Sequence, residues 1–207
     1  MTSAVAQRIR ISSQGTVGYD AALQAMRELT ARRGADTPDE LWLLEHPPVY
    51  TLGLAADKAH GPALDNGIPV VQTERGGEVT YHGPGQVVLY ALIDLARRNI
   101  KVKRFVWLLE QSVIDLLDGR GERRPGAPGI YVDGAKVAAL GIRVSRGCSF
   151  HGLALNVDMD LAPYSAIDPC GYPGLRVTQT RDLGIDGSTG TLGAQLAQIL
   201  AGKLEHA

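Results

Sequence analysis

Cysteine and long apolar runs are both scarce in this sequence. Its 207 residues contain two cysteines, Cys148 and Cys170, and neither belongs to a Cys-x-x-Cys pair. Two such cysteines indicate free thiols in a reducing compartment, and a single disulfide between them is the alternative. The longest apolar run, residues 87–93, is too short to span a bilayer, and residues 1–10 have no apolar core of signal-peptide length. We therefore expect a cytoplasmic protein with no membrane partner.

Neither sign of charge is in excess. Lysine and arginine contribute 21 residues and aspartate and glutamate 22, which leaves a formal net charge of −1. No global field therefore draws the chain to nucleic acid, and no basic stripe of the kind that binds a DNA backbone dominates. Histidine, cysteine, aspartate and glutamate nowhere cluster with metal-ligand spacing. We expect no metal and no nucleic-acid partner.

Hydrophobic periodicity predicts helices near both ends of the chain and strands between them. Helical spacing is present over residues 19–33 and 102–117. A third helix is predicted from Ser188 or Thr189, with a buried face made of Leu192, Leu196, Ile199 and Leu200. Buried or half-buried strands are predicted at residues 40–46, 68–73 and 86–95.

The middle of the chain predicts a three-stranded meander. Residues 130–132 lead into an Asp-Gly turn at 133–134, and the chain returns over residues 136–144. An Arg-Gly turn at 146–147 then leads into residues 149–159. Adjacent strands flanked by helices indicate an α+β domain, with the helices on one face of a sheet.

Cys170 is the first candidate for chemistry. It lies in the sequence Ile-Asp-Pro-Cys-Gly-Tyr-Pro-Gly, residues 167–174, where two prolines and two glycines exclude regular structure. A thiol in such a loop is expected to be accessible, whereas structural cysteines are usually buried. This context fits a nucleophile and also an incidental loop cysteine. Cys148 begins a strand, where a small apolar filler is the favoured interpretation.

Lys136 is the candidate partner of a cysteine nucleophile. Such a thiol needs a histidine base or a nearby cation to ionise near neutral pH. Lys136 opens the otherwise apolar run 136–142 directly after a tight turn. A partly desolvated ammonium at this position would act strongly on a neighbouring thiol. From this sequence context alone, an ordinary hairpin lysine that points at water is the favoured interpretation.

A glycine-rich segment, Arg-Gly-Gly-Glu-Val-Thr-Tyr-His-Gly-Pro-Gly-Gln, occupies residues 75–86. It matches neither the phosphate loop that ends in Lys-Ser/Thr nor the G-x-G-x-x-G fingerprint. Paired glycines let a ligand approach the backbone, and backbone amides can hold a carbonyl oxygen. A turn between strands is the alternative. His82 either orients a thiolate or an oxyanion, or is a satisfied structural histidine.

Four segments in one order resemble a known family. They are residues 75–86, residues 129–141 with Gly-Ile-Tyr-Val and Lys-Val-Ala-Ala-Leu-Gly, residues 146–157 (Arg-Gly-Cys-Ser-Phe-His-Gly-Leu-Ala-Leu-Asn-Val), and the Pro-Cys-Gly-Tyr of residues 169–172. With this spacing the chain resembles the bacterial lipoyl(octanoyl) transferases, octanoyl-[acyl-carrier-protein]:protein N-octanoyltransferases. The resemblance implies the biotin/lipoate protein ligase-like catalytic fold, an α+β domain with a mixed β-sheet flanked by helices. It also implies a single domain over residues 1–207.

The resemblance further implies roles for individual residues. Cys170 would carry the octanoyl group as a thioester, and Lys136 would lower the pKa of its thiol. No cofactor is implied. The substrate pocket would be lined by Arg75, Gly76, Gly77, Glu78, Val79, Thr80, Tyr81, His82, Ala139, Leu140, Gly141, Gly152, Leu153 and Ala154. Small residues at 139, 141, 152 and 154 would leave room for the acyl chain.

The implied partners are two kinds of protein. Octanoyl-acyl carrier protein would be the donor. The acceptors would be the lipoyl domains of 2-oxoacid dehydrogenase complexes and the glycine cleavage H protein. Three other functions stay open: an ATP-dependent lipoate or biotin ligase, a thioester hydrolase with His82 or His151 as base, and a non-enzymatic carrier-protein-binding module.

Overall fold

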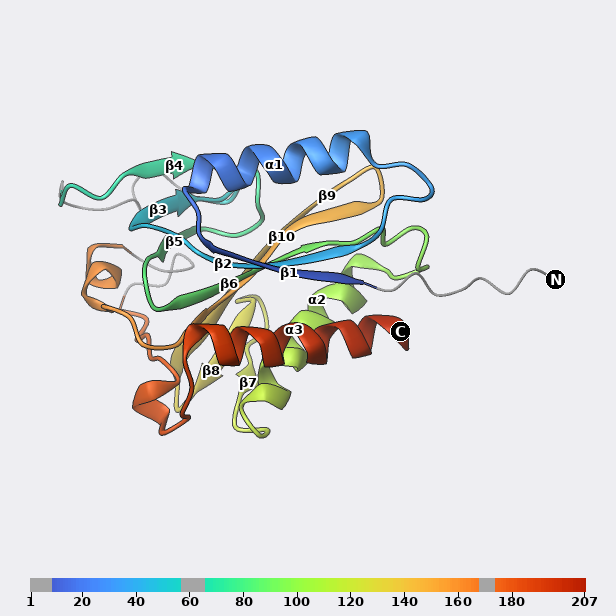
Figure 1. Ribbon diagram of the computed structural model, residues 1–207. Coiled ribbons are helices and arrows are strands. Elements are labelled where there is room, and N and C mark those ends of the chain that lie inside the picture. The colour runs from blue at the N-terminus through green and yellow to red at the C-terminus, as the bar shows by residue number, and fades with distance from the viewer. Residues whose placement is uncertain (1–8, 57–65, 168–173) are drawn as a thin grey trace.

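A seven-stranded mixed sheet forms the centre of the computed structural model, which describes residues 9–56, 66–167 and 174–207 (Figure 1). Its strand order is β1-β2-β6-β10-β9-β8-β7. β1 pairs with β2 in parallel and the other neighbours are antiparallel. The strands are β1 (Arg10–Thr16), β2 (Glu40–Glu45), β6 (Gln86–Leu92), β7 (Glu122–Arg123), β8 (Gly129–Val132), β9 (Ala135–Ser145) and β10 (Cys148–Asn156).

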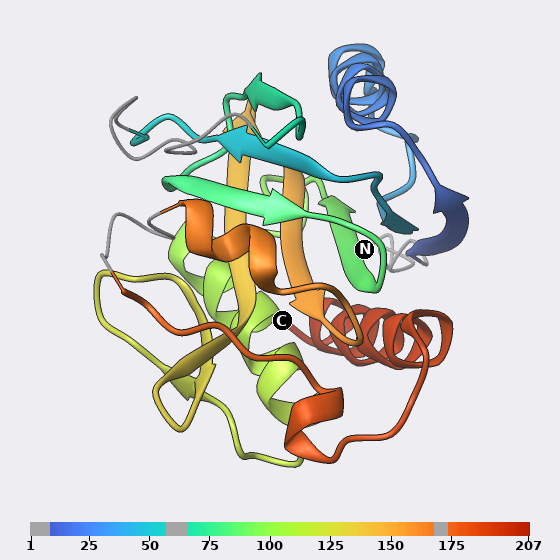
Figure 2. The ribbon, with the colours of Figure 1, turned by 90° about the vertical axis from the view of Figure 1, so that its left-hand side faces the viewer.

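A smaller sheet of three strands packs across the large one. Its order is β4-β3-β5, with β3 at Val49–Leu52, β4 at Val70–Gln72 and β5 at Val79–His82. In Figure 2 its strands, in cyan and green, run across β9 and β10, drawn in yellow to orange. The two sheets are hydrogen-bonded where the amide of Gly76 donates to the carbonyl of Ile142, at 2.9 Å. The site described below lies between them.

The helices lie on both faces of the large sheet, so the expectation that they cover one face is wrong. α2 (Val102–Leu116) and α3 (Thr189–Glu205) pack on the face that carries Leu41 and Leu43. α1 (Tyr19–Arg32) packs on the opposite face, which carries Trp42 and Leu44 (Figure 1). The reason is visible in β2, whose four central residues are all buried. A strand that is apolar on both sides requires a covering layer on each.

The predicted helices and the meander are confirmed, with small shifts of their ends. Both turns of the meander have positive φ at their two central residues, 49° and 78° at 133–134 and 49° and 80° at 146–147. This is the type I′ geometry that two-residue hairpins favour. The strands β1, β3, β5 and β7 were not predicted, since they are short or lack apolar alternation.

α3 begins where its capping residues require. The Ser188 hydroxyl accepts from the amide of Thr191, and the Thr191 hydroxyl accepts from the amide of Ser188, so the helix has a capping box. Leucines at every fourth position, 192, 196, 200 and 204, are buried against the sheet. Ile199 lies beside this stripe and is only half-buried, contrary to the predicted face.

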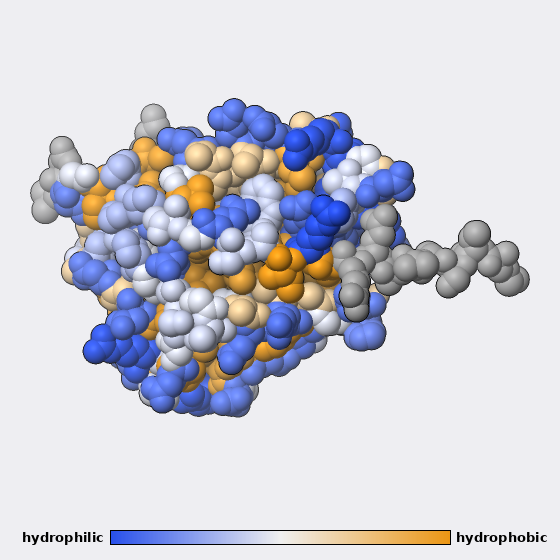
Figure 3. Space-filling view, viewed as in Figure 1, coloured by the Kyte–Doolittle hydropathy of each residue, from blue (hydrophilic) through white to orange (hydrophobic). Residues whose placement is uncertain are grey.

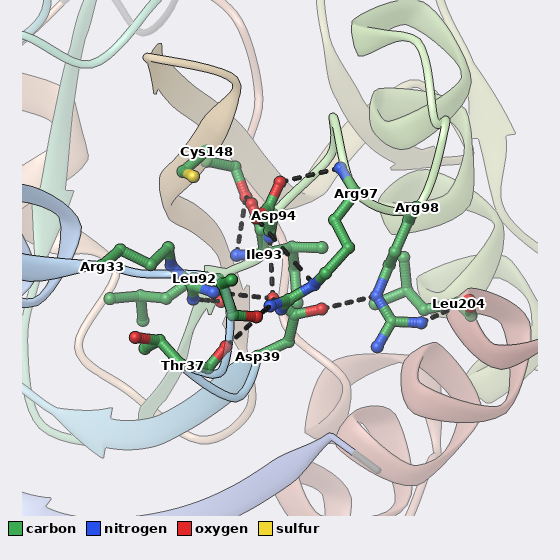
Figure 4. A network of polar contacts seen from close by, with 12 residues as sticks. Arg33, Thr37, Asp39, Leu92, Ile93, Asp94, Arg97, Arg98, Cys148 and Leu204 are labelled. Atoms are coloured by element: carbon green, nitrogen blue, oxygen red, sulfur yellow. Dashed lines mark hydrogen bonds and ion pairs between the residues drawn. The ribbon is translucent and has the colours of Figure 1, made fainter. Parts of the chain in front are cut away.

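A buried ion network joins the ends of several elements (Figure 4). Asp39, which is fully buried, accepts from the guanidinium groups of Arg33, Arg97 and Arg98 at 2.9, 2.9 and 2.6 Å. It also accepts from the backbone amide of Asp94 at 2.8 Å. Arg33 follows α1, Asp39 precedes β2, and Asp94, Arg97 and Arg98 follow β6, so one carboxylate holds three elements together.

The surface shows no single dominant apolar area on the face seen in Figure 3. Hydrophobic residues on this face lie in separate groups among hydrophilic ones. Over the part of the chain that the structure describes, none of the helices has the length and apolar character needed to cross a membrane.

Candidate active site

A narrow cavity of about 50 Å³ lies between the two sheets. Its walls come from the glycine-rich segment, from β5 and β6, and from the paired middles of β9 and β10. The lining residues are Tyr19, Arg75, Gly77, Glu78, Val79, Thr80, His82, Val88, Tyr90, Lys136, Ala139, Leu140, Gly141, His151, Gly152, Leu153, Ala154, Asn156, Tyr164 and Val177.

Most residues of the predicted pocket meet in this cavity, although they come from three separate stretches of sequence. Gly76 and Tyr81 are the exceptions. Gly76 lines a neighbouring cavity of about 420 Å³, next to Ala127 and Ile142. Tyr81 does not line this cavity, and its ring lies 5.5 Å from those of Tyr50 and Tyr164. The binding roles of the lining residues remain predictions.

Lys136 lies inside the protein and does not point at water as an ordinary hairpin lysine would. It is 3% exposed. Its backbone is held on the far side from β8, where the amide donates to the Arg176 carbonyl at 2.8 Å and the carbonyl accepts from Thr178 at 2.9 Å. Its ammonium lies over the ring of Tyr131, 5.4 Å from the centroid. Burial places this cation among apolar and aromatic groups, where its charge acts strongly on neighbours.

Gly129 makes room for the Lys136 side chain. A Cβ at Gly129 would lie 2.7 Å from Cε of Lys136 and 3.3 Å from its Nζ. Gly129 is paired with Ala139 across the β8–β9 ladder. The lysine side chain therefore extends along β9 from its own Cα toward the level of Ala139, which lines the cavity.

Cys170 falls outside the described residues, so its predicted role rests on the sequence. The chain from residue 174 onward is described, and this segment is fixed beside Lys136. Val177 forms a parallel bridge with Lys136 and lines the cavity. Asn156 at the end of β10 donates through its side chain to the Thr178 carbonyl at 2.9 Å and accepts at its carbonyl from Thr180 at 3.0 Å.

The glycine-rich segment bridges the two sheets. The Arg75 guanidinium donates to the carbonyl of Thr51 at 2.6 Å and to its hydroxyl at 2.9 Å. Gly53 packs directly on this segment, because a Cβ at Gly53 would lie 2.1 Å from the Gly77 carbonyl oxygen. Residues 75–78 are therefore fixed by the end of β3 on one side and by Ile142 of β9 on the other.

His46 and His82 are buried, hydrogen-bonded and neutral. The Nδ1–H of His46 donates to the Val17 carbonyl at 2.6 Å, so its Nε2 accepts from the Tyr90 hydroxyl at 2.7 Å. His82 donates through Nδ1 to the Gln86 side-chain oxygen at 2.7 Å. Burial lowers the pKa of His46, and burial followed by the nearby His46 lowers the pKa of His82 to about 3. The hydrogen bond and the low pKa of His82 favour a structural role for this histidine over a role as a base.

His151 differs from these two histidines. It is 1% exposed, and neither ring nitrogen has a hydrogen-bond partner in the described part of the chain. Burial lowers its pKa to about 3. Its ring stacks on Phe150 with centroids 5.0 Å apart and lies edge-on to Tyr90 at 6.1 Å.

Two predicted pocket glycines have a reason other than room for a chain. A Cβ at Gly152 would lie 2.1 Å from the Leu89 carbonyl oxygen, and one at Gly141 would lie 2.6 Å from that of Gly76. Both added groups would therefore meet backbone of an adjacent segment. These glycines line the cavity and also allow close approach of main chains, whereas Ala139 and Ala154 carry small side chains into its lining.

Sequence reasoning missed several lining residues. Tyr19 begins α1 and Tyr90 lies in the apolar run of β6, where each is typical of a core aromatic residue. Val88, Asn156, Tyr164 and Val177 also line the cavity. No local pattern distinguishes these side chains, since only tertiary packing of distant segments brings them together.

Cys148 is a buried free thiol, as the filler interpretation predicts. Burial, with the nearby Asp94 carboxylate as the next cause, raises the pKa of this thiol above its ordinary value. Metal-binding groups of three or more His, Cys, Asp and Glu side chains are not found among the described residues.

Solved structures define the class of this fold. A bipartite lipoate protein ligase from Thermoplasma acidophilum superposes with a TM-score of 0.75, at 18% identity over 96% of this chain and 84% of that one. A lipoate-protein ligase A bound with ATP gives 0.74, at 16% identity over 95% and 85%. The biotin protein ligase from Aquifex aeolicus, in complex with biotin and ATP, gives 0.57 at 11% identity, over 94% and 70%. The architecture is that of the lipoate and biotin protein ligases.

The family follows from closer relatives. The family model for the lipoyl protein ligase A/B catalytic domain matches residues 18–198. Octanoyltransferase from Dechloromonas aromatica is 57% identical over 93% of this chain and 95% of its own. Those from Azoarcus sp. and Thiobacillus denitrificans are 54% and 59% identical, over 96% and 84% of this chain and 88% and 81% of theirs. The chain belongs to the octanoyltransferase family and is an acyltransferase.

Proposed function

We propose that this enzyme moves an octanoyl group from octanoyl-acyl carrier protein to a lysine of lipoyl domains, through a thioester on Cys170. The observation that carries the proposal is a cavity between the two sheets that is lined in part by small and aliphatic residues and has the buried Lys136 among its lining residues.

The first step exchanges one thioester for another. The Cys170 thiolate attacks the carbonyl carbon of the donor thioester, a new carbon–sulfur bond forms, and the bond to the donor sulfur breaks. The donor leaves as a thiolate and takes up a proton. Because sulfur replaces sulfur, the step is nearly balanced and needs no ATP. The Lys136 ammonium stabilises the thiolate of Cys170 by its positive charge in a site of low polarity.

The second step forms an amide. The amine of the acceptor lysine attacks the acyl carbon on Cys170, the carbon–nitrogen bond forms, and the Cys170 thiolate leaves. The proton lost from the attacking nitrogen goes to Lys136 in its neutral form or to water. The reaction runs downhill because an amide is more stable than a thioester.

The donor and acceptors belong to this proposal as well. The donor is octanoyl-acyl carrier protein, and the acceptors are lipoyl domains of 2-oxoacid dehydrogenase complexes and the glycine cleavage H protein. The family's name supports the octanoyl group, and its likeness to lipoate ligases supports a lipoyl-domain acceptor. The wall of the cavity near Lys136 is formed by the chain that follows Cys170, which supports the pairing of the two residues.

A hydrolase with a histidine base is disfavoured. An efficient general base has a pKa near the working pH. The pKa values of His82 and His151 are both lowered to about 3. An imidazole with so low a pKa accepts a proton from a thiol only weakly, so the cation of Lys136 is the better partner for Cys170.

Intact-protein mass spectrometry after brief incubation with octanoyl-acyl carrier protein tests this proposal. We expect one octanoyl increment on the wild-type protein and on Cys148→Ala, and none on Cys170→Ala. Cys148→Ala is the matched control, because this thiol is buried. An adduct that persists in Cys170→Ala, or turnover only with free octanoate and ATP, would overturn the thioester route.

A further inference from the structure

His151 occupies the end of the acyl cavity away from Lys136. It pairs with Ile142 in the β9–β10 ladder, while Ala139, at the level reached by the Lys136 side chain, pairs with Ala154. Ile142 lies three residues beyond Ala139 along β9, which is a rise of about 10 Å. An extended chain of eight carbons spans about 9 Å, since each bond of about 1.5 Å advances the zigzag by about 1.25 Å. An octanoyl group that starts beside Lys136 therefore ends beside His151.

The chain end would meet a polar group at this position. Both ring nitrogens of His151 lack a partner in the described part of the chain, although the residue is 1% exposed. The neighbouring His46 and His82 have hydrogen-bond partners at both nitrogens. Buried polar groups in folded proteins are normally satisfied. His151 lines the cavity, so a group bound there can supply a partner.

The backbone also marks His151 as a special position. Its φ is +60°, in the left-handed region that few residues other than glycine adopt, although histidine does so more often than most. Strain of this kind, in a residue that contacts a ligand cavity, is typical of functional sites. It is held in place by Gly152, which lets β10 approach β6 closely, and by a contact from the His151 amide to Sδ of Met26 at 3.4 Å.

We propose that His151 makes the far end of the acyl cavity polar, so that the site accepts medium-chain acyl groups that carry a hydroxyl on their last carbon. This inference rests on the proposed function, because it places the acyl carbonyl at the Lys136 end. A hydroxyl at that carbon would donate to the unprotonated nitrogen of His151 or accept from the other. Burial keeps the ring neutral, so one nitrogen donates and the other accepts.

An apolar end would act differently. A hydrophobic pocket disfavours an added hydroxyl by about 100-fold, because the hydroxyl loses its water without gaining a partner. A histidine that lacks a partner removes this penalty for the hydroxylated chain and gains nothing from a methyl end. We therefore expect the ratio of the affinities for the hydroxylated and the plain acyl chain to depend on the side chain at position 151.

The test measures dissociation constants of octanoate and 8-hydroxyoctanoate by calorimetry. The wild type should bind the two acids within about 5-fold of each other, and His151→Phe should prefer octanoate by about 30-fold or more. His151→Asn keeps hydrogen-bonding groups and tolerates the positive φ, so it should stay close to the wild-type ratio. Cys148→Ala is the control, a buried side chain of the same strand outside the cavity lining, and should leave the ratio unchanged.

Two results would overturn the inference. One is a wild type that rejects 8-hydroxyoctanoate as strongly as His151→Phe does, and the other is a wild type that binds neither acid. The octanoyl adduct on Cys170 is read separately by mass spectrometry. A normal adduct with no effect of residue 151 on the ratio refutes the inference and leaves the proposed function standing. The ratio change without an adduct refutes the proposed function and leaves the polar cavity end standing.

Discussion

Lys136 depends on a glycine for the position of its side chain. A Cβ at Gly129 would lie 2.5 Å from the Ala138 carbonyl oxygen and 2.7 Å from Cε of Lys136, and Gly129 has φ +131°. The glycine is therefore required both by its backbone and by the lysine beside it. Any larger residue at 129 has to move the ammonium out of the level of Ala139.

Gly129→Ala should reduce acyl transfer at least 10-fold and lower the free energy of unfolding by about 1–3 kcal/mol, because the new methyl group overpacks the site. Gly119→Ala is the matched control. Its φ is +80°, but a Cβ there meets nothing within 4 Å. It should cost about 1 kcal/mol of stability through its positive φ and keep full activity. Equal activity of the two variants, measured as the rate of octanoyl transfer, would contradict this role of Gly129.

The buried neutral histidines make stability depend on pH. The pKa of His82 and of His151 is about 3 in the folded protein, against 6.5 for an ordinary histidine. Below pH 6.5 the unfolded chain therefore binds more protons than the folded chain, and stability falls as pH falls from about 6.5 toward 3. Each histidine contributes a slope of up to about 1.4 kcal/mol per pH unit.

Urea unfolding at pH 6.5 and pH 5 measures this slope. The wild type should lose about 2–4 kcal/mol over the interval, and the His82→Gln/His151→Asn double variant should lose clearly less. The comparison with the variant separates the histidines from carboxylates that titrate at lower pH. The same slope in both proteins would show that these histidines are not held neutral.

At the level of single residues, sequence patterns selected candidates but did not reveal their surroundings. Lys136 was a candidate because it opens an apolar run, and its burial fits that argument. The isolation of His151 had no sequence signal, because it depends on which nitrogens of three histidines find partners. Cys170 stays a prediction.

Among the elements, the pairing of β6 with β10 sets the shape of the cavity. Gly152 lies against the backbone of Leu89, and Ala154, two residues further on, borders the cavity. The two residues belong to one strand but have different neighbours. Substitution should therefore have different effects at the two positions.

Gly152→Ala should destabilise the fold by about 3 kcal/mol, because its Cβ would collide with a main-chain oxygen. Ala154→Leu should instead fill the cavity and shift the preferred acyl chain to fewer than eight carbons. Ala194→Leu, on the exposed side of α3, is the control for the added volume. Initial rates with hexanoyl, octanoyl and decanoyl donors measure the preference. An unchanged chain-length preference in Ala154→Leu would show that Ala154 does not border the space that the acyl chain occupies.

The network around Asp39 holds α1, β2 and the end of β6 together at the end of the large sheet (Figure 4). Asp39→Asn leaves three guanidinium groups without their carboxylate and should cost about 3–5 kcal/mol of unfolding free energy. Asp158→Asn breaks the exposed pair with Arg181 and should cost less than about 1 kcal/mol. Chemical denaturation of both variants measures the difference. Similar values would mean that the buried network adds no stability.

Secondary structure was predictable where local chemistry decides it. The Asp-Gly turn of residues 133–134, the Arg-Gly turn of 146–147 and the cap at Ser188 all lie where expected. The side of the sheet taken by α1 was not predictable from the helix itself. It follows from β2, whose continuous apolar run signals two covering layers but does not say which helix covers which face.

For the whole molecule, the cavity forms because the small sheet lies across the large one. The glycine-rich segment links them, and neither sheet alone supplies all the walls of the cavity. The family resemblance implied a mixed sheet flanked by helices but not the second, smaller sheet, and the TM-scores to lipoate ligases show the shared fold. The same fold serves ATP-dependent ligases, so the fold does not decide the route of the acyl group.

The most direct test of the central claim uses the isolated octanoyl-enzyme. The adduct is freed of donor, mixed with a lipoyl domain in the absence of ATP, and both proteins are weighed by mass spectrometry. Transfer through the Cys170 thioester predicts that the octanoyl increment leaves the enzyme and appears on a lysine of the lipoyl domain, about one per enzyme. An increment that stays on the enzyme, is lost to water, or moves only when ATP is added would contradict it.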